Sequence, residues 1–140
     1  MCWFGLNKSI VAEKNIKVFK ICLKKKGKIL SYYNEFVYEV GAEYSATFGI
    51  RIKDFGRIAI YEGLHSYSSD CCLKIYKEGI YCDWFGRGEP IVKVDCIIPK
   101  GAIYYENEKG EIVSNRLEIV SVQDVDFIDN SLLVVMPKSK

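Results

Sequence analysis

The excess of β-branched aliphatic residues is the feature of this 140-residue sequence that most restricts its fold. The chain contains 17 Ile and 12 Val, but only 8 Leu and 5 Ala. Branching at Cβ restricts χ1 and suits the pleated surface of a strand, whereas Leu and Ala favour helices. Ten Tyr and seven Phe also favour strands. We therefore expect an α+β fold that is β-rich, with a mixed or antiparallel sheet and one or two short helices.

Length and hydropathy predict a single globular domain over residues 1–140. The longest run without a charged residue is the eight residues 130–137, whereas a membrane-spanning helix needs about 20 apolar residues. The first residues, MCWFGL, do not form a basic segment followed by a long apolar one, so we expect no secretory signal. These observations predict a cytoplasmic protein with no membrane partner.

Basic residues are concentrated in the first part of the chain. Residues 1–60 carry 11 Lys and Arg against 5 Asp and Glu, while the remainder carries 9 against 13. A basic half can bind an anionic partner such as nucleic acid. Much of the excess, however, is the run Lys24, Lys25, Lys26 and Lys28 around Gly27, which is typical of a solvated hairpin turn. The run lacks the interleaved aromatic residues and Arg of a nucleic-acid surface, so the sequence does not favour nucleic acid as a partner.

The cysteines predict neither a metal site nor a disulfide framework. The chain has six, at positions 2, 22, 71, 72, 82 and 96, and none forms a C-x-x-C pair. Disulfide frameworks belong to secreted chains. Cys22 and Cys96 lie in apolar, strand-like segments, where a free thiol behaves as a small hydrophobic side chain.

Alternation of apolar and polar residues predicts the clearest strands. In residues 16–23 it places Phe19 and Ile21 on one face and Lys20 on the other, which is the pattern of a strand with one buried face. Residues 91–98 alternate in the same way. Residues 102–106 and 111–120 flank a turn-like sequence, NEKG, and predict a hairpin.

One short helix is predicted over residues 69–78. Ser68 or Ser69 can cap its first turn, Asp70 complements its positive end, and Gly79 can end it. Residues 80–90 contain two glycines and a proline after this helix and predict a loop.

The search for catalytic residues leads to one segment, EGLHSY at residues 62–67. His65 is the only histidine, which excludes a two-histidine metal site, and no nucleophile elbow or phosphate loop is present. If the segment is extended, His65 and Tyr67 share a face and Leu64 and Ser66 share the other. Two roles stay open: an anion site at the start of the predicted helix, or hydrogen bonds from His65 and Tyr67 that fix a neighbouring loop. The second is the more common role of such residues.

Three short motifs carry a family resemblance. The stretches YEVG at 38–41, GLH at 63–65 and SNRLEI at 114–119 resemble a family of small uncharacterised bacterial and phage-associated proteins. That family shares the patterns Y-E-x-G, G-[FL]-H and S-x-[KR]-[LI]-x-[IV]. The likeness spans residues 36–120 and implies no established activity.

A more distant resemblance is to ADP-ribosyltransferase-like domains. It rests on GLHS at 63–66, the helix predicted after it, and the strand that ends at the proline–glycine turn near residue 100. It implies NAD as the cofactor, with His65, Tyr67 and Glu118 near the nicotinamide. The sequence has FKIC at 19–22 where that family usually has a His-Gly pair.

The leading hypothesis is a non-enzymatic module that binds a partner protein or a small ligand, without a cofactor, of the kind that mobile elements encode. The alternative is an ADP-ribosyltransferase-like enzyme, or an NAD-binding relic of one. In both cases His65, Tyr67 and Glu118 are the candidate ligand-binding residues, and no catalytic residue is assigned.

Overall fold

The computed structural model describes residues 3–31, 36–53, 55–68, 91–124, 127–128 and 132–133. Within these ranges the chain forms fifteen strands and no helix. The strands are β1 (Trp3–Leu6), β2 (Ile10–Val11), β3 (Ile16–Lys25), β4 (Lys28–Leu30), β5 (Val37–Tyr38), β6 (Glu43–Ser45), β7 (Gly49–Ile52), β8 (Arg57–Glu62), β9 (Leu64–Ser68), β10 (Ile91–Ile98), β11 (Ile103–Glu106), β12 (Glu111–Ser114), β13 (Arg116–Asp124), β14 (Phe127–Ile128) and β15 (Leu132–Leu133).

The prediction of an α+β fold with short helices is wrong for the described residues, because they form antiparallel sheets alone. The β-branched excess agrees with this result, since Ile and Val make up much of strands such as β3, β8 and β10. The predicted helix at 69–78 and the loop at 80–90 lie outside the described residues.

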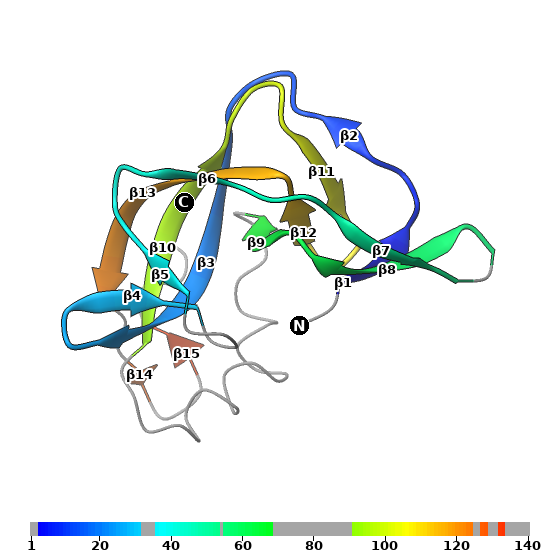
Figure 1. Cartoon of the computed structure of the whole chain (residues 1–140). Helices are drawn as coiled ribbons and strands as arrows, with labels where there is room; N and C mark the ends of the chain where they lie inside the picture. The colour runs from blue at the N-terminus through cyan, green and yellow to red at the C-terminus, as the bar shows by residue number, and fades with distance from the viewer. Residues whose placement is uncertain are drawn as a thin grey trace.

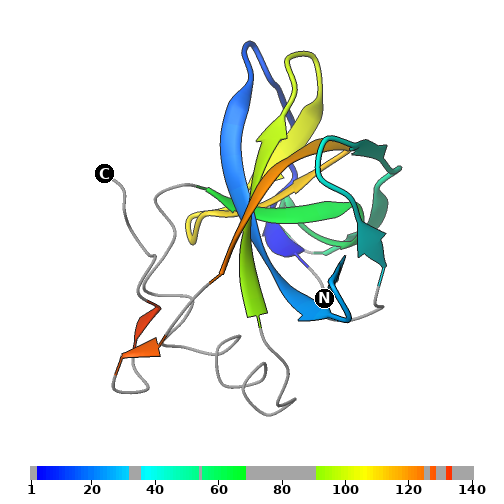
Figure 2. The same ribbon diagram turned by 90° about the vertical axis from the view of Figure 1, so that its left-hand side faces the viewer.

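Most strands belong to one ten-stranded antiparallel sheet. Its order is β2-β11-β12-β9-β3-β10-β13-β6, and β4 and β5 extend it from the edge of β3. The long strands β3, β10 and β13 lie side by side at its centre, and Figure 2 shows how strongly they twist across one another. The hairpin predicted around residues 107–110 is present as β11 and β12.

Strand β3 is buried on both faces, which corrects the prediction of one buried face. Its residues 18–23 are all buried, and they include Lys20, which is 9% exposed. The face of Lys20 belongs to the main core, together with Val94 of β10, Leu117 of β13 and Tyr38 of β5. The reason is the curvature of the sheet, which brings β5 over a face that simple alternation assigned to solvent.

A second, three-stranded sheet has the order β1-β8-β7 and packs against β11 and β12. One face of this sheet carries Ile58 and Ile60, which are buried with Trp3, Tyr105 and Val113 in a separate core cluster. The indole Nε1 of Trp3 donates a hydrogen bond of 2.7 Å to the backbone carbonyl of Glu111. The β7–β8 hairpin projects from the rest of the molecule on the right of Figure 1.

The lysine run forms the hairpin turn that the sequence predicts. Lys25 pairs with Lys28, and the two residues between them have positive φ, 53° for Lys26 and 77° for Gly27. Two successive positive φ angles match the twist of the flanking strands in a two-residue hairpin. This basic run is therefore a solvent-facing turn at the end of β3 and β4.

Candidate functional site

His65 and Tyr67 lie on β9 and project from the same face, as the sequence predicts for an extended segment. Leu64 projects from the other face into the main core. The Tyr67 ring packs against Phe19 of β3, with ring centroids 5.6 Å apart.

The surroundings of His65 favour a structural role. Burial lowers the pKa of its imidazole from 6.5 to about 4, and the charge of Lys20 acts in the same direction. Hydrogen bonding to the backbone of Gly63 and Ile60 opposes this shift only partly. His65 is therefore neutral at pH 7, and one side of its ring holds the backbone of the β8–β9 corner.

Glu118 does not join these two residues. It lies on β13 and pairs with Ile97 of β10 and Glu43 of β6. The strands β3 and β10 separate β13 from β9, so Glu118 is three strand positions from the His65 strand, about 14 Å along the sheet. The three predicted ligand-binding residues do not form one site.

A feature that the sequence did not indicate is a break along one edge of β3. Strand β10 covers the other edge along the whole length of β10. On the broken edge, β9 pairs only with Val18 and Phe19, and β4 begins to pair at Leu23. Residues 20–22 therefore lie at a seam where one neighbouring strand leaves β3 and another joins it.

Lys20 bridges this seam. Its ammonium donates a hydrogen bond to the backbone carbonyl of His65 on β9. Its Nζ also lies 5.2 Å from the ring centroid of Tyr38 on β5, and the Tyr38 hydroxyl hydrogen-bonds it. The side chain thus connects two strands that no backbone ladder joins, which is a structural role for a buried lysine.

The electrostatics of the seam keep Lys20 charged and its neighbouring thiols neutral. Burial lowers the pKa of Lys20, but its interactions with Tyr38, Cys22 and Cys96 act in the opposite direction and outweigh burial, so the pKa is raised above its ordinary value. Burial raises the pKa of Cys22 to about 11 and that of Cys96 to about 12, although Lys20 opposes both shifts. Both cysteines are free and buried.

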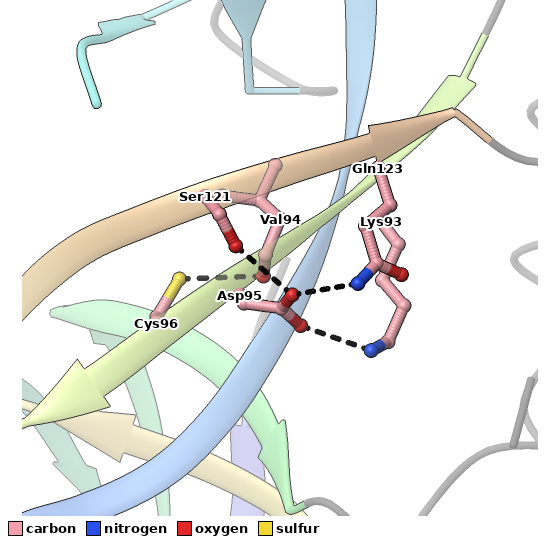
Figure 3. A network of polar contacts seen from close by, with 6 residues as sticks. All are labelled: Lys93, Val94, Asp95, Cys96, Ser121 and Gln123. Carbon is pink, nitrogen blue, oxygen red and sulfur yellow. Dashed lines mark hydrogen bonds and ion pairs between the residues drawn. The ribbon is translucent and has the colours of Figure 1, made fainter. Parts of the chain in front are cut away.

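A polar network on β10 and β13 is also structural (Figure 3). The carboxylate of Asp95 accepts hydrogen bonds from Lys93 at 2.9 Å and from Ser121 and Gln123 at 3.1 Å each. Ser121 is directly opposite Asp95 in the ladder, and Gln123 is directly opposite Lys93, so the network joins β10 to β13. Because Lys93 neutralises the one carboxylate, the cluster offers no charge for a ligand. The described residues contain no group of three His, Cys, Asp or Glu side chains that could hold a metal ion.

Another candidate binding surface is the solvent-facing side of the β1-β8-β7 sheet, which we call the outer face. It consists of the residues that alternate with the buried Trp3, Ile58 and Ile60, namely Phe4, Leu6, Arg51, Lys53, Arg57, Ala59 and Tyr61. Glu62 also lies on this side, because a bulge in the pairing of β8 with β7 interrupts the alternation after Tyr61. Phe4 is 50% exposed and Tyr61 is 46% exposed. A cation lies over each ring: Arg51 Cζ is 5.3 Å from the Tyr61 centroid, and Lys53 Nζ is 4.8 Å from the Phe4 centroid.

The outer face is not evident from the sequence, because its residues come from three strands. Alternation of Arg51 with Lys53, and of Arg57 with Tyr61, is visible in the sequence and could have indicated a basic and aromatic strand face. Phe4 is far from them in the sequence, and only the pairing of β1 with β8 brings it to the same face.

The described residues form a β-rich domain with a basic, aromatic surface on a projecting sheet. No family model, curated protein or solved structure matches the chain. The two family resemblances of the sequence therefore stay predictions. Among the described residues, no helix is long and apolar enough to cross a membrane.

Proposed function

We infer that this protein is a cytoplasmic binding module and that the outer face is its contact surface. One observation carries the proposal: large apolar side chains gather on the small sheet although they are exposed. Phe4, Leu6 and Tyr61 lie on the outer face, and Ile52 and Phe55 lie at the end of the same hairpin, 83% and 96% exposed. Exposed apolar side chains that cluster, with charged groups among them, are typical of an interaction site.

The cations of the outer face support the proposal. Within the described part of the chain, neither Arg51, Lys53 nor Arg57 forms an ion pair with a carboxylate, whereas Arg116 does so with Glu43 at 2.7 Å. A cation without a carboxylate partner can bind an anionic group without first breaking an ion pair. The free thiols of Cys22 and Cys96 support a reducing compartment such as the cytoplasm.

The alternative of an NAD-dependent enzyme has no comparable support. It needs His65, Tyr67 and Glu118 at one ligand, and the sheet separates Glu118 from the other two.

Co-purification from cells that express the chain tests the proposal. The face variant replaces Arg51, Lys53 and Arg57 by Gln. The matched control variant replaces three exposed lysines elsewhere by Gln, namely Lys17, Lys26 and Lys28. We expect the wild type and the control variant to retain the same material and the face variant to lose it. Equal retention by all three proteins would refute the proposal.

A further inference from the structure

We propose that the partner of the outer face is single-stranded nucleic acid, bound without sequence preference. The inference rests on the proposed function and specifies its partner class. The lysine run at Lys24–Lys28 does not favour nucleic acid as a partner, because it lacks arginine and interleaved aromatic residues. The outer face has both.

The charge of the outer face matches a polyanion. On this side of β1, β8 and β7, the described residues provide three cations, Arg51, Lys53 and Arg57, and one carboxylate, that of Glu62. Glu62 ends β8, where a bulge in the pairing with β7 places its side chain on the side of Tyr61. The face therefore keeps an excess of positive charge. A protein partner would have to be acidic and apolar at once, whereas a nucleic-acid strand presents phosphates and ring systems along its whole length.

The aromatic rings match the second component of such a strand. Phe4 pairs with Ala59, which pairs in turn with Arg51, so a ring and a guanidinium flank a small residue in one row across the sheet. Tyr61 is two residues further along β8 on the same face. Aromatic rings and guanidinium planes are the groups on which unpaired bases stack. Stacking needs an exposed base face, so the arrangement favours a single strand over a duplex.

The lack of sequence preference follows from what the outer face does not provide. Base edges are read by hydrogen-bonding side chains such as Asn, Gln, Asp and Glu, or by bidentate Arg in the groove of a duplex. Among the described residues of this face, Glu62 at the end of β8 is the one side chain of the first four types. Stacking and phosphate contacts alone tolerate every base.

Fluorescence anisotropy with labelled 12-nucleotide oligo(dT) and oligo(rU) tests the inference. Three phosphate contacts to a single strand predict a slope of about −2 for log K against log salt concentration, so affinity should fall about 100-fold between about 20 and 200 mM NaCl. The face variant should lose most binding and most of this slope. The control variant with Lys17, Lys26 and Lys28 replaced should bind as the wild type does.

The rings are tested by Phe4→Leu and Tyr61→Leu, which keep an apolar side chain at half-exposed positions. Each should weaken binding by at least about fivefold and leave the salt slope unchanged. Urea midpoints equal to that of the wild type show that a variant is folded. If a Leu variant is unfolded, the binding affinities of the face variant and of the control variant test the inference without it.

Several results would overturn the inference: no binding by the wild type at the lowest salt, an equal loss in the control variant, or binding of a 12-base-pair duplex or phosphatidylserine vesicles as tight as that of the single strands. The co-purified material separates the two proposals. If the face variant loses the co-purified material but nuclease does not remove it from the wild type, the proposed binding module is supported and nucleic acid is refuted as its partner. Material that does not depend on the outer face refutes both.

Discussion

Protonation of His65 should make the stability of this protein depend on pH in a range where most carboxylates do not titrate. The imidazole has a pKa of about 4 in the folded protein, against 6.5 ordinarily. Because the folded pKa is lowered, the unfolded chain binds a proton between these values and the folded chain does not. Stability from this residue is therefore present above pH 6.5 and is lost as the pH falls toward 4.

The size of the effect follows from the two pKa values. Between pH 7 and pH 5 the free energy of unfolding should fall by about 2 kcal/mol on account of His65 alone. Urea unfolding of the wild type and of His65→Gln at pH 7, 6 and 5 measures it, because Gln keeps a hydrogen-bond donor but does not titrate. The difference in stability between the two proteins should shrink by about 2 kcal/mol as the pH falls. A difference that stays constant from pH 7 to pH 5 would refute the burial argument for His65.

Three further predictions concern other parts of the molecule. Gly63 has a φ of 146°, and a Cβ there would lie 2.5 Å from Cγ2 of Val113. Gly63→Ala should therefore lower the free energy of unfolding by about 2 kcal/mol or more. A thermal-denaturation midpoint equal to that of the wild type would contradict this prediction. Cys22 and Cys96 are buried with raised pKa values. Peptide mass spectrometry should therefore find both thiols unmodified after iodoacetamide treatment of the folded protein at pH 8, and alkylated after the same treatment in urea. Rapid labelling of the folded protein would contradict this prediction and show that the seam opens. Millimolar NAD should not raise the melting temperature, because Glu118 on β13 is separated by two strands from His65 and Tyr67 on β9. A dose-dependent rise would restore the enzyme alternative.

The sequence predicted the strands whose pattern is local. The alternation of residues 91–98 corresponds to β10, and the lysine run around Gly27 forms the predicted hairpin. The shared face of His65 and Tyr67 also follows from the period of a strand, without any knowledge of neighbours.

What the sequence could not show depends on pairing between distant segments. Alternation places Lys20 opposite Phe19, but only the curvature of the sheet and the position of Tyr38 show that this second face is buried too. Phe4 joins Arg51 and Tyr61 for a similar reason, because β1 pairs with β8. The helix that capping residues at 68–70 predict lies outside the described residues, so it stays a prediction.

The pairing of β3 with β10 also has a consequence for the order of folding. This central ladder joins Ile16 to Ile98, whereas the hairpins β3–β4, β7–β8 and β11–β12 join neighbours in the chain. Local hairpins form within microseconds, but a ladder between distant segments forms more slowly, because closing the long loop between them has an unfavourable entropy. We therefore expect the hairpins to form before β10 pairs with β3. The ammonium of Lys20 then loses its hydration only when this central ladder forms.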